Sequence, residues 1–114
     1  MKKQVILYEK KLPGISIHIN ANITKGGGLQ IEGIDTGENV ENIWGSWDYE
    51  YYINTDKKNK NNLIKQLIKQ GFKINNDMEL LIHLQQYYAC NEAYTEIHSL
   101  LTKENIEFQT FTWA

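Results

Sequence analysis

Residues 28–54, GLQIEGIDTGENVENIWGSWDYEYYIN, decide the fold that this chain is expected to adopt. Residues 29–32 alternate apolar and polar side chains, which is the period-2 pattern of a half-buried strand. Residues 48–53 combine aromatic and β-branched side chains, which also favour a strand. The residues between them are rich in glycine, asparagine and glutamate, as is typical of a loop. We therefore predict two strands joined by a long loop.

Alternation along the second strand sorts its side chains onto two faces. These are Tyr49, Tyr51 and Ile53 on one face, and Asp48, Glu50 and Tyr52 on the other. The first face carries more apolar surface, so we expect it to pack inward. The second face, with its two carboxylates, is then expected to look outward.

The loop between the two strands raises two questions that the sequence leaves open. Gly33 and Gly37 bracket a short segment, so we expect the first strand to bulge or end there. A short helical turn is predicted at residues 38–43. Trp44 and Trp47 lie in this polar loop, and they either fold back as a lid on the core or leave one ring exposed as a contact residue.

The N-terminal part of the chain adds two more strand candidates. Residues 4–9 and 14–20 both suit a strand, and Pro13 with Gly14 marks the turn between them. The second candidate alternates isoleucines with polar residues, so His18 is expected to point away from the buried face. Residues 21–28 connect this pair to the central pair as a hairpin, so the four strands are predicted to form an antiparallel meander.

The remainder of the chain is predicted to be helical until its last strand. Thr55 or Asp56 can cap a helix that starts near residue 57 and ends before Gly71. An apolar stripe then favours one long helix over residues 77–103, capped by Asn76, although a break at residues 90–92 remains an alternative. Residues 106–113 are rich in strand-forming side chains and should return to the sheet.

Together these elements predict one α+β domain over residues 1–114. The expected architecture is an antiparallel sheet of four to five strands, in the order β-β-β-β-α-α-β, with the helices packed on one face. The single cysteine, Cys90, cannot form an internal disulfide, which fits a reducing compartment, and we expect a cytoplasmic protein. No apolar run approaches the roughly 20 residues of a membrane span.

Charge is distributed unevenly along the chain. Residues 26–56 contain seven acidic residues and no base, whereas residues 57–73 contain six lysines and no acid. The chain has no arginine, which argues against a nucleic-acid partner because the guanidinium group is the preferred ligand for phosphate. We therefore expect the acidic segment, and not the lysine-bearing helix, to carry the function.

One resemblance rests on the motifs of the acidic segment. Gly33-x-Asp35-x-Gly37, followed by Asp48-Tyr49-Glu50-Tyr51 and by the tail at 106–113, resembles a group of small bacterial proteins. In that group a G-x-D-x-G turn precedes an acidic-Tyr-Glu-Tyr strand. The similarity spans most of residues 28–114 and implies no particular activity. Small acidic bacterial α+β proteins often act as immunity proteins that block a toxin, so an immunity-type role follows by analogy.

The preferred functional hypothesis is a non-enzymatic inhibitor that binds a basic protein, either a toxin or a host defence protein. Its acidic groups would speed the encounter and its aromatic rings would hold the complex. The candidate partner-binding residues are Glu32, Asp35, Glu38, Glu41, Trp44, Trp47, Asp48, Glu50 and Tyr52. We expect no cofactor and no metal, because His18, His83 and His98 lack the spacing of a ligand set.

Two alternatives use the same residues. Trp44, Trp47 and Tyr52 would stack on a small molecule if the loop enclosed a pocket. Glu32, Asp35, Asp48 and Glu50 would serve a carboxylate-based hydrolase, or bind a hard cation, if adjacent strands brought them together.

Overall fold

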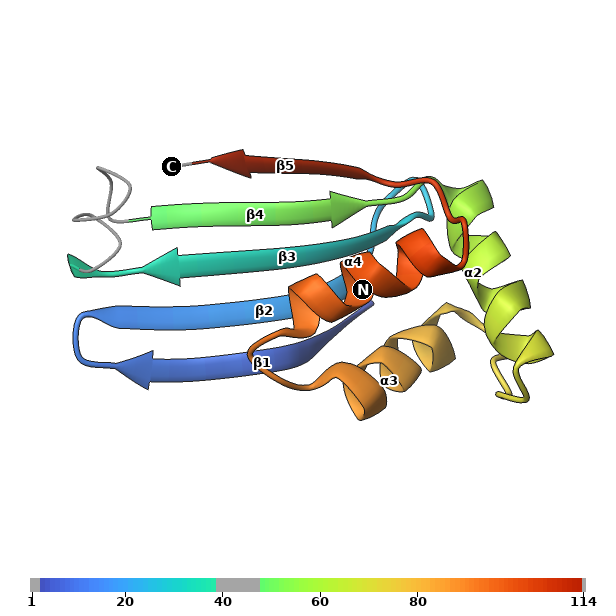
Figure 1. The fold of residues 1–114 in the computed structure, drawn as a ribbon, viewed down its shortest axis with the longest axis horizontal. Coiled ribbons are helices and arrows are strands. Elements are labelled where there is room, and N and C mark those ends of the chain that lie inside the picture. Colours follow the sequence, from blue (N-terminus) through green and yellow to red (C-terminus); the bar gives the residue numbers. More distant parts are fainter. Residues whose placement is uncertain (1–2, 39–47, 114) are drawn as a thin grey trace.

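Five strands form one antiparallel sheet in which the spatial order is the order of the chain (Figure 1). The computed structural model describes residues 3–38 and 48–113. The strands are β1 (Gln4–Leu12), β2 (Ile15–Ile23), β3 (Leu29–Thr36), β4 (Asp48–Asn54) and β5 (Gln109–Trp113). The predicted meander is confirmed, and β5 returns to pair with β4. The α+β class with a five-stranded sheet is therefore correct.

β3 differs from its prediction because it neither bulges nor ends at Gly33. It pairs in continuous register with β2 and β4 as far as Thr36. The glycine is needed for another reason: a Cβ on Gly33 would lie 1.8 Å from Cε2 of Tyr51. The register irregularity lies in β1, between Ile6 and Tyr8.

Three helices follow β4 in the described part of the chain. They are α2 (Lys57–Lys69), α3 (Asp77–Tyr88) and α4 (Ala93–Lys103). Asp56 caps α2 by accepting a 2.7 Å hydrogen bond from the amide of Asn59. Asn76 caps α3 by accepting from the amide of Glu79, whose carboxylate accepts in return from the amide of Asn75. This arrangement is close to the predicted capping box.

The prediction of one long helix over residues 77–103 is wrong, and the alternative break is present. The chain leaves the helical conformation at Ala89, where ψ is 75°. The break lets α3 pack mainly against β1 and β2, while α4 lies against β3 (Figure 1).

One face of the sheet and the inner sides of the helices form the core. The fully buried residues with large side chains are Ile19, Leu29, Ile31, Ile53, Leu63, Leu67, Leu80, Leu81, Leu84, Ile97 and Leu101. On β4 the tyrosine face turns inward, as predicted. Ile53 is fully buried, and the ring of Tyr51 meets that of Tyr94 on α4 edge to face, with centroids 5.0 Å apart.

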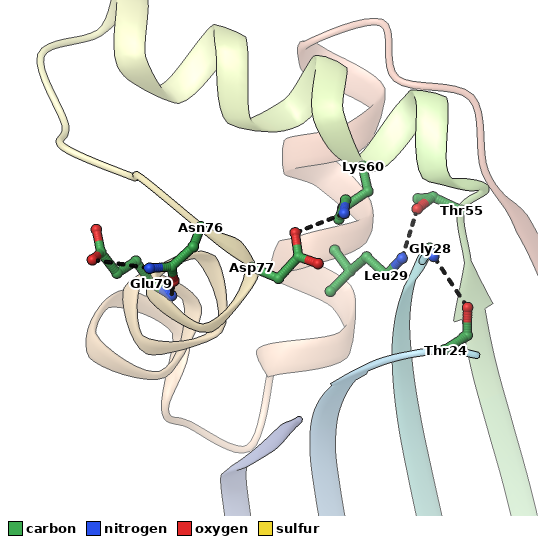
Figure 2. A network of polar contacts seen from close by, with 8 residues as sticks. All are labelled: Thr24, Gly28, Leu29, Thr55, Lys60, Asn76, Asp77 and Glu79. Carbon is green, nitrogen blue, oxygen red and sulfur yellow. Dashed lines mark hydrogen bonds and ion pairs between the residues drawn. The ribbon is translucent and has the colours of Figure 1, made fainter. Parts of the chain in front are cut away.

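A group of polar contacts holds the helices to one end of the sheet (Figure 2). Lys60 of α2, only 3% exposed, donates a 2.6 Å hydrogen bond to Asp77 at the start of α3. Thr55 accepts from the amide of Leu29 through its hydroxyl. A Cβ on Gly28 would lie 1.9 Å from the carbonyl oxygen of Thr55, so this close approach of β3 to the β4–α2 connection requires a glycine.

Candidate functional site

The face of the sheet opposite the helices carries the acidic segment that the sequence singled out. We call it the open face. Strand pairing aligns one residue from each strand in a row across it: Ile6, Asn20, Glu32, Tyr52 and Phe111. The row beside it contains His18, Ile34, Glu50 and Trp113. Carboxylates and aromatic rings therefore alternate at the β3–β4–β5 end of this face.

Tyr52 links the acidic and the aromatic parts of this surface. Its hydroxyl donates a 2.5 Å hydrogen bond to Oε1 of Glu50. Its ring stacks on Phe111, with centroids 4.6 Å apart and planes inclined by 17°. The hydrogen bond to Glu50 raises the pKa of the Tyr52 phenol well above 10, and partial burial and the charges of Glu50 and Glu32 act in the same direction. The phenol is thus a neutral donor at physiological pH.

Glu32 is oriented by the neighbouring strand on its other side. The side-chain amide of Asn20 donates a 3.0 Å hydrogen bond to its Oε1, and Asn20 in turn accepts from Asn22 at 2.9 Å. Both asparagines are buried, although they lie on the open face. This chain of amides holds the Glu32 carboxylate in place without neutralising its charge.

Glu32 and Glu50 have no cationic partner within residues 3–38 and 48–113. The ion pairs found there join Lys60 to Asp77 and His18 to Glu9. On the open face, the described residues of β3, β4 and β5 include no lysine. The charge segregation seen in the sequence therefore persists on this surface, which we call the acidic–aromatic face and define by Glu32, Glu50, Tyr52, Phe111 and Trp113.

The structure places Asp35 on the opposite side of the sheet from this group. Asp35 lies on the helix side of the sheet, where it accepts a 2.9 Å hydrogen bond from the hydroxyl of Tyr51. Burial raises the pKa of Asp35, and the Tyr51 hydrogen bond opposes that shift. Glu38 is exposed just beyond β3. Asp48, exposed at the first position of β4, lies on the open face beside Glu50, as predicted.

Some of the predicted site residues lie outside the part of the chain that the structure describes. Glu41, Trp44 and Trp47 lie outside the described residues, as does most of the helical turn expected at residues 38–43. The proposed quartet of carboxylates can be assessed, because Glu32, Asp35, Asp48 and Glu50 are all described. Asp35 faces the opposite side of the sheet from Glu32 and Glu50. In the described part of the chain, no group of three or more His, Cys, Asp or Glu residues is arranged to hold a metal ion.

Sequence reasoning missed two aromatic residues of the acidic–aromatic face. Phe111 is 42% exposed and Trp113 is 65% exposed, and both lie on β5. The sequence predicts that residues 106–113 join the sheet, but it does not identify the strand beside which they lie. Alternation within β5, once that strand is paired with β4, places both rings beside Tyr52 and Glu50.

A third row of the open face consists entirely of side-chain amides. Gln4, Asn22, Gln30, Asn54 and Gln109 are aligned across the five strands. Within this row the amide of Gln30 donates a 2.8 Å hydrogen bond to Asn54. These uncharged groups flank the acidic–aromatic face and give it a border that forms hydrogen bonds, which is the usual composition of the rim of a protein interface.

A groove of about 780 Å³ lies where the β4–α2 and α4–β5 connections meet. It is lined by Asn54, Thr55, Asp56, Asn59, Thr102, Asn105, Ile106, Glu107, Phe108 and Gln109. Apart from Ile106 and Phe108 these residues are polar, whereas small-molecule sites are mostly apolar. Tyr52, which was expected to stack on a small ligand, is not among them.

No family model, curated protein or solved structure matches the chain. The resemblance to small bacterial proteins therefore stays a prediction. Within the described residues, no helix is both long enough and apolar enough to cross a membrane.

Proposed function

We propose that this chain is a non-enzymatic inhibitor that binds a basic protein through its acidic–aromatic face. The observation that carries the proposal is the joining of Glu50, Tyr52 and Phe111 by one hydrogen bond and one ring stack on an open sheet surface. Interface hot spots are enriched in tyrosine, tryptophan and arginine. A partner rich in lysine or arginine supplies the complementary charge.

The arrangement suits binding because its groups are held before a partner arrives. Glu32 is fixed by Asn20, and Glu50 is fixed by Tyr52, so little side-chain freedom is lost on association. Trp113 and Phe111 offer apolar area beside these charges. An unpaired acidic surface also speeds the encounter with a basic partner at low ionic strength.

The class of inhibitor that best fits these features is the immunity type, which blocks a toxin, or a phage protein that blocks a host defence protein. A target that acts on nucleic acid carries the basic surface that this face would complement, and we propose that the two proteins meet in the cytoplasm. The free thiol of Cys90 is compatible with that reducing compartment. The lysines of α2 lie on a different element from the acidic–aromatic face.

The test begins with the product of the neighbouring gene and with proteins captured from the native host. The captured partner is purified, and its affinity is measured by calorimetry at two salt concentrations. We expect a basic protein whose binding weakens with salt. Charge reversal by Glu50→Lys should weaken binding by about 10-fold to 1,000-fold, in line with the cost of losing a close charge pair at an interface.

Glu107→Lys supplies the matched control. The substitution changes the charge by the same amount as Glu50→Lys. Glu107 is exposed, but it lies in the α4–β5 connection, outside the acidic–aromatic face. We expect it to leave the affinity within about twofold of the wild-type value. Equal losses for the Glu50 and Glu107 variants would mean that net charge, and not this face, governs binding. Failure of both sources to yield a partner would remove the proposal.

A further inference from the structure

The two edges of the sheet are protected to very different degrees. β1, at one edge, carries Glu9, Lys10 and Lys11 and contains a register irregularity, and both features discourage a further strand from pairing. β5, at the other edge, reads QTFTW and has no charge, no proline and no bulge. All five of its residues are exposed, and no described residue pairs with its outer side (Figure 1).

The sequence of β5 is complementary to itself. If two copies lie antiparallel about a two-fold axis at Phe111, Thr110 of one copy faces Thr112 of the other. Phe111 then faces its own counterpart, and Gln109 faces Trp113. Threonine pairs and aromatic pairs are both favourable across antiparallel strands, and no like charges meet.

We propose that β5 pairs with β5 of a second copy of this chain, so that the two sheets join into one of ten strands. The two-fold axis places both open faces on the same side of the joined sheet. The stack of Tyr52 on Phe111 then continues across the axis as a row of four rings. Main-chain hydrogen bonds along the outer side of β5 supply the remaining contacts.

The size of the contact sets the expected strength. Five residues on each side bury less than the roughly 1,200–2,000 Å² of a standard interface, so dissociation at micromolar concentrations is expected. Sedimentation of the full chain should show a mass that rises with concentration from 13.3 kDa towards twice that value. A mass that stays at 13.3 kDa up to millimolar protein would overturn the proposal.

Two double variants test the register, and both leave the acidic–aromatic face intact. Thr110 and Thr112 are exposed on the opposite face of the sheet from Phe111. Thr110→Lys with Thr112→Lys sets like charges against each other across the axis, and dimerisation should weaken at least about tenfold. Thr110→Lys with Thr112→Glu sets opposite charges against each other, and the dimer should persist or strengthen.

The matched control adds two lysines to an exposed helix by Thr95→Lys with Ser99→Lys, and it should dimerise as the wild type does. If the variant Thr110→Lys with Thr112→Glu dissociates as far as the variant Thr110→Lys with Thr112→Lys, pairing in this register is excluded. This inference is independent of the proposed inhibitor role. If the variant Thr110→Lys with Thr112→Lys is monomeric and still binds the basic partner, dimerisation and partner binding are separate properties.

Discussion

The ring of Tyr51 lies over Gly33 of the neighbouring strand, and a Cβ added to Gly33 would be 1.8 Å from Cε2 of that ring. The missing side chain leaves room for the ring, whose hydroxyl donates a hydrogen bond to Asp35. The ring also meets Tyr94 of α4, so this glycine supports a contact between the sheet and a helix.

Replacing Gly33 with alanine should therefore destabilise the fold. We expect Gly33→Ala to cost about 1–3 kcal/mol in the free energy of unfolding, because the ring must be displaced. In the Tyr51→Ala background the same change should cost little, so a double-mutant cycle should show coupling of similar size. Gly26→Ala, at a position with nothing within 4 Å of the added Cβ, is the control. Additive effects of the Gly33 and Tyr51 changes would refute this role for the glycine.

The ion pair between α2 and α3 predicts an asymmetric response to mutation. Asp77→Asn leaves a buried Lys60 without its carboxylate and should cost up to about 3–5 kcal/mol. Lys60→Met should cost less, because Asp77 keeps access to water with a side chain that is 24% exposed. Denaturant unfolding measures both variants, and Lys65→Met on the exposed side of α2 should be nearly neutral. A larger loss for Lys60→Met than for Asp77→Asn would contradict this account.

Two buried or hydrogen-bonded tyrosines predict a loss of stability in alkali. The pKa values of Tyr51 and Tyr52 are raised above 10, the first mainly by burial and the second mainly by its hydrogen bond to Glu50. The folded state thus holds these protons more tightly than the unfolded chain. Stability is fully present below pH 10 and should fall as the pH rises above it.

Tyr51→Phe with Tyr52→Phe should flatten this alkaline decline, which melting temperatures at increasing pH will show. A control variant, Tyr87→Phe, removes an exposed ring hydroxyl and should keep the wild-type slope. In a pH titration followed by phenolate absorbance, the double variant should have two fewer tyrosines that ionise at high pH. An unchanged slope in the double variant would exclude these two phenols as its source.

His83 predicts a loss of stability in acid. It is 8% exposed and packs against Phe72, with ring centroids 4.5 Å apart, so burial lowers its pKa below 6.5. The folded state therefore disfavours the protonated ring. The stability from His83 is present above pH 6.5 and should be lost as the pH falls through that value.

The imidazole signals of the folded protein should show His83 titrating below 6.5. His83→Leu should remove most of the pH dependence of the melting temperature in this range. The control is His98→Leu, the same change at an exposed histidine on α4, and this variant should retain the pH dependence of the melting temperature. A His83 midpoint above 6.5 would be inconsistent with a buried neutral ring.

Much of the fold was predictable because the relevant signals are local. Alternation defined the strands, and Asp56 and Asn76 marked the starts of two helices. The helix break at Ala89 was not determined by local pattern, because the apolar stripe continues through it. It lets α3 pack against β1 and β2 and α4 against β3, and these contacts between distant segments depend on the whole chain.

The candidate site was predicted only in part, for a similar reason. An expected bulge near Gly33 obscured the alternation that places Glu32 and Asp35 on opposite faces. Phe111 and Trp113 became recognisable only when β5 was seen beside β4. Strand neighbours that are distant in sequence are set by tertiary packing, and one sequence does not reveal them.

The central claim is that the acidic–aromatic face contacts a basic partner. The most direct measurement is an NMR titration of the isotope-labelled chain with the purified partner, following its aromatic side chains. The account predicts that signals of Tyr52, Phe111 and Trp113 shift together on binding, while those of Tyr87 and Tyr94, on the helix side, remain in place. Shifts concentrated on Tyr87, Tyr94 and the helices, with Tyr52, Phe111 and Trp113 unaffected, would contradict it.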